Sequence, residues 1–226
     1  MRLAMICRVA LIALVLTFAV VSNSALAAGP AGDISAAAAK QQLVDGNKRF
    51  VQGNLMHPNQ SIERRNEVAQ AQHPLAIVVG CSDSRVPPEV VFDQGIGDLF
   101  VVRVAGNILN DENIGSVEYA AEHLGAPLVI VLGHQRCGAV TAAVKGGEAP
   151  GHIEDIVKAI EPAVDEAKKK CGKCDLVEKA AHINVQRAVR QLRTSEPLLA
   201  EMVKSGKLTV AGAFYDLDSG TVNFMK

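Results

Sequence analysis

Two cysteines and one histidine stand where a folded sheet could hold a metal ion. Cys81 directly follows a short apolar segment that ends in Gly80, and His134 follows a second such segment that ends in Gly133. Cys137 comes three residues after His134. Two thiolates and one imidazole form a three-ligand set for tetrahedral zinc, which leaves the fourth position free for water or substrate.

The two apolar segments, 74–80 and 126–133, are short and continuous, as is typical of fully buried strands. In an open parallel sheet, ligands bind in the crevice beyond the carboxyl ends of the strands. Adjacent strands would therefore deliver Cys81 and His134 to one place. If a helix begins directly after the second strand, Cys137 faces the same side as His134, and the helix N-terminus favours its thiolate.

A carboxylate and a guanidinium follow Cys81 at alternating positions. In extended backbone, residues 81, 83 and 85 point to one side, so Asp83 and Arg85 would lie beside the cysteine. Asp83 could bind either the metal or Arg85, and these two interactions compete. Each residue alone has an ordinary structural explanation, since a buried cysteine usually packs as a small hydrophobic side chain. Taken together, the residues favour a metal centre.

The remaining chain alternates helical and apolar segments. Further strands are predicted at 99–105 and 208–215, with 221–224 as a returning hairpin arm. Helices are predicted from Ser35 to about Gln52, from Ser61, from Asn113 to Leu124, over 137–144, over 152–194 with a break near 171–175, and from Ser195 to Gly206. Strands separated by helices predict an α/β fold with a mostly parallel central β-sheet flanked by α-helices, in a single domain over residues 28–226.

The first 27 residues have a different character. Arg2 and Arg8 precede an apolar run over 9–21 and a stretch of small residues over 22–28. This pattern is typical of a secretory signal peptide that is cleaved after Ala27, and the run is shorter than the roughly 20 residues of a spanning helix. We expect residues 1–27 to be removed and the mature protein to be periplasmic or secreted, without a membrane span. With 23 basic and 24 acidic side chains, the charge gives no reason to expect a nucleic-acid partner.

Cys171 and Cys174 form a separate pair. A thioredoxin-like redox motif would follow the first strand of a βαβ unit, whereas this pair lies between predicted helices. A second metal half-site is the other alternative, but no nearby pair of Cys or His residues completes it. Because an exported protein meets an oxidising environment, we predict a short-loop disulfide.

Three segments of the chain resemble the β class of carbonic anhydrases. The segment Cys81-Ser-Asp-Ser-Arg-Val-Pro-Pro is similar to the first signature of that family, and the segment from Glu118 through His134-Gln-Arg-Cys137-Gly is similar to the second. Residues 97–107, between them, also resemble the family. The similarity extends over nearly all of the predicted mature chain.

The resemblance implies zinc-dependent, reversible hydration of carbon dioxide to bicarbonate and a proton by zinc-bound hydroxide. It implies zinc on Cys81, His134 and Cys137, with Asp83 and Arg85 as a catalytic dyad. Two thiolates cancel the charge of Zn²⁺, so we expect activity to rise toward mildly alkaline pH. The resemblance also implies a homodimer, often assembled into a higher homo-oligomer, with active sites at the subunit interface.

The residues that we expect to line the carbon dioxide pocket are Val86, Val104 and Ala105. Some family members hold a regulatory bicarbonate with Trp, Arg and Tyr. Val78 stands at the Trp position here, although Arg103 and Tyr215 remain, so the sequence does not favour that regulation.

Two other functions would keep part of this site. One is hydrolysis of carbon disulfide or carbonyl sulfide, and the other is noncatalytic binding of zinc or bicarbonate. The sequence shows no added tail that would restrict access to the site. The intact pair of Asp83 and Arg85 argues against lost catalysis.

Overall fold

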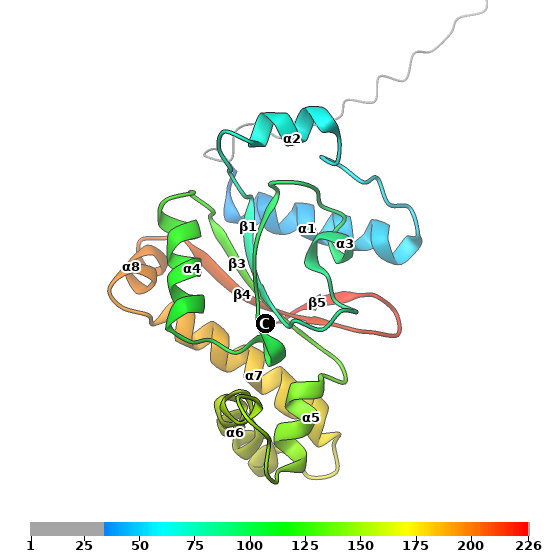
Figure 1. Cartoon of the computed structure of the whole chain (residues 1–226), viewed down its shortest axis with the longest axis vertical. Coiled ribbons are helices and arrows are strands. Elements are labelled where there is room, and N and C mark those ends of the chain that lie inside the picture. The colour runs from blue at the N-terminus through cyan, green and yellow to red at the C-terminus, as the bar shows by residue number, and fades with distance from the viewer. Residues whose placement is uncertain (1–33, 226) are drawn as a thin grey trace, which may run out of the picture.

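A computed structural model describes residues 34–225, and Figure 1 shows them as a central sheet with helices on both faces. The predicted signal peptide lies outside the described residues. In chain order the elements are α1 (Ala36–Gln52), α2 (Ile62–Val68), β1 (Ala76–Gly80), α3 (Pro88–Val91), β2 (Leu99–Arg103), the 3₁₀ helix η2 (Ala105–Asn107), α4 (Asp111–Glu122), β3 (Leu128–His134), α5 (Gly138–Lys145), α6 (Ile153–Lys170), α7 (Leu176–Arg193), α8 (Leu198–Lys204), β4 (Thr209–Tyr215) and β5 (Val222–Phe224).

The sheet confirms the predicted α/β class. Its strand order is β2-β1-β3-β4-β5, and the first four strands run parallel. The short strand β5 returns antiparallel to β4, as the hairpin pattern predicts. The side chains that could bind a metal at the ends of β1 and β3 therefore come from neighbouring parallel strands and lie at the same end of the sheet.

The central strands bury both faces, which explains their continuous apolar sequence. Alternate residues of β3 enter two separate cores: Val129 and Val131 pack with α4 to α8, whereas Leu128, Ile130 and Leu132 pack with α1 and α3. All seven residues of β3 are buried. A strand covered on both sides is a rigid support for the side chain at its end.

Two predicted helix starts are wrong by a few residues. The N-cap of α4 is Asn110, not Asn113, because the Asn110 side chain accepts the backbone N–H of Asn113. The helix α8 begins after Pro197 rather than after Ser195. Both differences lie away from the strand ends, so they do not alter the predicted site.

Helices α6 and α7 pack as a pair joined by a short turn (Figure 1). The disulfide between Cys171 and Cys174 closes this turn, with their Cα atoms 5.4 Å apart, as the sequence predicts. Among the helices of residues 34–225, none has both the length and the apolar character that crossing a bilayer requires.

Candidate metal centre

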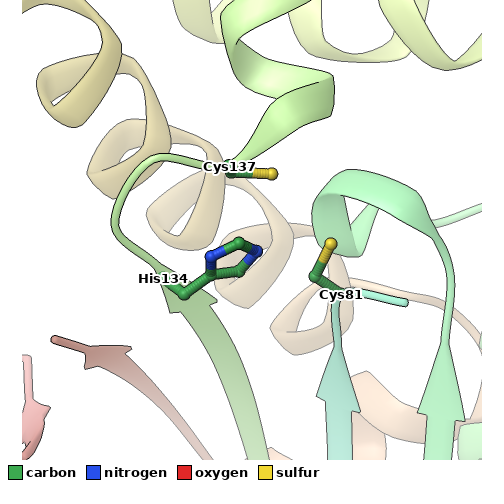
Figure 2. A group of neighbouring side chains, drawn as sticks. All are labelled: Cys81, His134 and Cys137. Carbon is green, nitrogen blue, oxygen red and sulfur yellow. The ribbon is translucent and has the colours of Figure 1, made fainter. Parts of the chain in front are cut away.

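Three side chains converge at the carboxyl ends of β1 and β3. Cys81 follows β1, His134 is the last residue of β3, and Cys137 is the N-cap of α5 (Figure 2). Their candidate ligand atoms all lie within 4.8 Å of one another. All three residues are buried, so one enclosed space receives two sulfurs and one imidazole nitrogen.

The route from His134 to Cys137 differs from the predicted helical one. His134 still belongs to β3, and a turn through Gln135 and Arg136 leads to the N-cap of α5. Arg136 has φ of 50°, in the left-handed region, which reverses the chain tightly. The two ligands therefore meet through a strand end and a turn rather than through neighbouring positions on one helix.

The close approach of α7 explains the glycine before His134. A Cβ atom on Gly133 would collide with Val185 of α7 and crowd the ring of Phe214. A Cβ atom on Gly80, the residue before Cys81, would meet only the Leu132 carbonyl oxygen, at an unstrained 4.0 Å. Packing against α7 therefore explains Gly133 but not Gly80.

The ring of His134 is oriented for a metal. Its Nδ1 lies 2.8 Å from the carbonyl oxygen of Gln135, and because a carbonyl can only accept, Nδ1 carries the proton. The lone pair is therefore on Nε2. Nε2 is buried and has no hydrogen-bond partner among the described residues. A buried acceptor is rarely left unpaired, so this atom fits a metal ligand.

The two thiols share their protons unequally. The pKa of the Cys81 thiol is lowered to about 4, first because Cys137 donates a hydrogen bond to it, against the opposing effect of burial. The backbone N–H groups of Gly106 and Asp83 lower it further. The pKa of Cys137 is raised because it donates to Cys81 and is buried. Deprotonation of Cys137 as well as Cys81 would place two negative charges side by side, which requires a cation next to them. Two thiolates and one imidazole therefore fit a zinc ion.

Asp83 binds Arg85 rather than pointing freely into the centre. The Arg85 guanidinium donates from Nε to Oδ1 at 2.9 Å and from Nη2 to Oδ2 at 2.7 Å, and the Arg85 backbone N–H also donates to Oδ1. These bonds, led by the side-chain bond of Arg85, lower the pKa of Asp83 to about 2. Residues 84 and 85 form a turn, so the predicted extended path is wrong although the predicted pairing is present.

Asp83 nevertheless remains beside the metal ligands. Its Oδ2, which binds Nη2 of Arg85, also lies 3.8 Å from Nε2 of His134. Arg85 also donates at 3.4 Å to the carbonyl of Arg136, in the turn before Cys137. The charged pair is thus connected to both strand ends.

Arg103 supports the Cys81 loop, a role that the sequence reasoning missed. From the end of β2 it donates from Nε to the carbonyl of Cys81 at 2.9 Å and from Nη2 to that of Asp83 at 2.7 Å. One side chain therefore holds the backbone of both Cys81 and Asp83. The sequence signal for this role was an arginine at the end of β2, the strand that pairs with β1.

The three predicted pocket residues lie in two places. Val86 is 2% exposed and packs in the core of the α1 face. Val104 and Ala105 are half-buried at the start of η2, directly before Gly106. Their role in substrate binding stays a prediction.

Comparisons with known proteins agree on one family. A family model described as carbonic anhydrase matches residues 76–222. The chain is 44% identical over 190 residues to a carbonic anhydrase of Mycolicibacterium smegmatis, covering 82% of this chain and 91% of that protein. It is 40% identical over 188 residues to carbonic anhydrase 2 of Mycobacterium tuberculosis, covering 81% and 89%.

Solved structures show the same fold. The β-carbonic anhydrase CcaA aligns with a TM-score of 0.66 at 27% identity, over 83% of this chain and 95% of that one. A Coccomyxa β-carbonic anhydrase solved with acetazolamide aligns with a TM-score of 0.66 at 25% identity, over 81% and 84%.

Proposed function

The chain belongs to the β-class carbonic anhydrases, which are zinc enzymes, and we propose that it hydrates carbon dioxide reversibly to bicarbonate and a proton with Asp83 and Arg85 as its catalytic dyad. The convergence of Cys81, His134 and Cys137 within 4.8 Å, beside a carboxylate that an arginine holds, carries this proposal. When bound to these residues, zinc supplies the Lewis acidity that lets water act as a nucleophile near neutral pH.

The role of Asp83 follows from its two neighbours. A carboxylate is itself a good zinc ligand, and Oδ2 lies only 3.8 Å from Nε2 of His134. Arg85 occupies both carboxylate oxygens and so would keep Asp83 from binding a zinc ion held by Cys81, His134 and Cys137. Because its pKa is lowered to about 2, Asp83 is an anion at neutral pH. It can therefore accept a hydrogen bond from water and orient that water toward the substrate.

Carbon dioxide is small and apolar, so its binding needs an apolar wall rather than charged groups. Val104 and Ala105 are half-buried next to Gly106, whose N–H contacts Cys81. We assign these two residues to the substrate wall. Val86 is buried in the core between the sheet and helices α1 and α3, directly after the turn at 84–85. We propose that it shapes the pocket by supporting this turn.

We also infer that the enzyme works as a homodimer or a larger homo-oligomer. The strand β2, Leu99–Arg103, is an edge of the described sheet, and its first four residues are apolar. Tyr119 of α4, near Phe100 of this strand, is 49% exposed. Uncovered apolar edges promote association, and a second copy would cover this one. Light scattering during size-exclusion chromatography should give a multiple of the chain mass, and a monomer would contradict the inference.

We propose export from the first 27 residues, whose pattern is that of a cleaved signal peptide. After expression in a Sec-competent bacterium, intact-mass measurement of the periplasmic fraction should give a chain that begins near Ala28. A soluble cytoplasmic product that retains Met1 would contradict it.

Stopped-flow measurement of carbon dioxide hydration on metal-analysed protein tests the catalytic proposal. We expect about one zinc per chain and turnover that follows zinc content. Zinc-loaded protein without hydration activity would leave the noncatalytic zinc protein as the function. Hydrolysis of carbon disulfide, assayed in parallel, distinguishes the remaining alternative.

A further inference from the structure

The sulfur of Cys81 accepts a hydrogen bond from a distant part of the chain. The backbone N–H of Gly106, in η2, donates to Sγ of Cys81 at 3.2 Å, across 25 residues of sequence. The other backbone donor, Asp83 N–H, belongs to the same loop as the cysteine and lies at 3.4 Å. The Gly106 contact therefore depends on how η2 is held.

Three helices fix the position of Gly106. Its φ is 72°, and a Cβ atom there would collide with Cδ1 of Ile160 in α6 and press on Ala139 in α5. From α7, Nδ2 of Asn184 donates to the Gly106 carbonyl at 2.7 Å. The first two contacts limit where the Gly106 backbone can lie, and the hydrogen bond holds its carbonyl group.

Asn184 is an unusual residue for its place. It is 6% exposed and lies among buried residues of α7 such as Ala180, Ala181 and Ala188. Burial of an amide costs free energy unless it forms hydrogen bonds. The bond from Nδ2 to Gly106 is thus a reason for an asparagine at a position where the helix otherwise buries apolar side chains.

We propose that Asn184 is a positioning residue of the metal centre: it holds Gly106 so that the Gly106 N–H donates to the Cys81 sulfur and reduces the charge that this sulfur gives to zinc. Hydrogen bonds to ligand atoms are a recognised means by which proteins adjust a bound metal. Without this bond the thiolate becomes a stronger donor and the metal a weaker Lewis acid. The inference rests on the zinc centre of the proposed function.

The test uses three variants of Asn184 and one control. Asn184→Ala and Asn184→Leu remove the donor, and Asn184→Gln keeps an amide. Asn184 borders a cavity of about 360 Å³, which can take the extra methylene of Gln. The control is Asn47→Ala, because Asn47 is an equally buried asparagine whose Nδ2 donates to the carbonyls of Val91 and Gly220 in the opposite core.

The first readout is the thiolate-to-cobalt charge-transfer band of the cobalt-substituted proteins, measured without turnover. We expect Asn184→Ala and Asn184→Leu to bind about one metal per chain and to shift this band to lower energy. Asn184→Gln should restore the band partly or fully. Asn47→Ala should lower the thermal midpoint while leaving the band in place.

The second readout is kcat/KM against pH for the zinc enzymes. We expect Asn184→Ala to lose about tenfold at neutral pH, with the profile displaced to more alkaline pH, in the range that loss of a contact to a metal ligand produces. A band and a pH profile that match those of Asn47→Ala would overturn the inference and make Asn184 a purely structural residue. Failure of the wild type to hydrate carbon dioxide would overturn the proposed function alone, because the band shift needs no turnover.

Discussion

Residues 34–225 contain two pairs of cysteines whose sulfurs lie close together, and the two pairs differ in their chemical state. Cys81 and Cys137 lie far apart in sequence, are 5% and 2% exposed, and remain free thiols. Cys171 and Cys174 are three residues apart, lie at the surface between α6 and α7, and form a disulfide. Proximity of sulfurs alone therefore does not decide between metal binding and oxidation.

The difference lies in the other groups that each pair meets. The buried pair has His134 within 4.8 Å of both sulfurs, and Cys81 receives N–H donors from Gly106 and Asp83. The surface pair has no such companions: within residues 34–225, the only group of three or more potential metal ligands is Cys81, His134 and Cys137. A third ligand and donors that stabilise thiolate are thus what separate a metal site from a disulfide.

Loss of one sulfur from each pair should give the largest contrast. Cys137→Ser removes a zinc ligand, so we expect zinc affinity and hydration activity to fall about 100-fold or more. Cys174→Ser, the matched control, should keep about one zinc per chain and near-normal turnover. Metal analysis after gel filtration and stopped-flow assays measure both effects. Full zinc retention by Cys137→Ser would remove Cys137 from the ligand set.

Removal of Arg85 should separate catalysis from zinc binding at the buried pair. Arg85→Ala frees the Asp83 carboxylate 3.8 Å from the His134 ligand atom, where it can take the open position at the metal. We expect zinc content to be unchanged and activity per zinc to fall about 10- to 100-fold.

Asp83→Ala completes this test. It should also keep zinc and lose activity, but a small anion such as azide should still reach its metal, whereas Arg85→Ala should exclude the anion. If the pair only steadies the loop, both variants lower the thermal midpoint and turnover per zinc stays near normal. Arg85 is exposed, so such a structural effect would be small.

The fold and the convergence of the three candidate ligands were largely predictable from the sequence because they depend on strong local patterns. Continuous apolar segments ending in Gly80 and Gly133 predict buried parallel strands, and the residue after such a strand must lie at the sheet edge. The helix starts of α4 and α8 were less accurate, since Asn110 and Asn113 are both acceptable caps and only the formed hydrogen bond distinguishes them.

The support around the ligands was not predictable in the same way. Arg103 and Asn184 reach the Cys81 loop and Gly106 from β2 and α7, and these long-range contacts leave no spacing pattern in the sequence. The local signals are only that Arg103 ends a strand and that Asn184 interrupts the apolar face of α7. The turns at 84–85 and 135–136 were also missed, because strand and helix periodicity does not describe them.

Removal of the surface disulfide should change stability but not chemistry. A four-residue loop is short, so the loop-entropy relation predicts that Cys171→Ser with Cys174→Ser lowers the free energy of unfolding by about 2 kcal/mol. Zinc content and kcat should match the wild type, since the turn lies outside the ligand cluster. Chemical denaturation and stopped-flow assays on the double variant check both statements, and a loss of activity per zinc would show that the two cysteine pairs are coupled.

The smallest expected effect is a loss of stability in mild acid that is caused by His182 in α7, the helix after the disulfide. His182 of α7 stacks on Phe214 with ring centroids 3.7 Å apart, and burial lowers its pKa below 6.5, although Glu178 acts in the opposite direction. The unfolded chain therefore binds a proton more readily than the folded one. The resulting stability is fully present above pH 6.5 and is lost as the pH falls from there through the folded pKa.

His182→Phe keeps an aromatic ring on Phe214 but cannot titrate, so it should remove this contribution to the pH dependence. The side chain is 35% exposed and water screens its charge, so we expect a difference below about 1 kcal/mol between pH 7 and pH 5. Because both proteins carry the same metal ligands, acid release of zinc cancels in the comparison. Urea unfolding at each pH gives the slope of the free energy of unfolding against pH for the wild type and for His182→Phe. Equal slopes would mean that His182 protonates as easily in the folded protein as in the unfolded chain, and the acid sensitivity would then belong to the buried ligand pair and its surroundings.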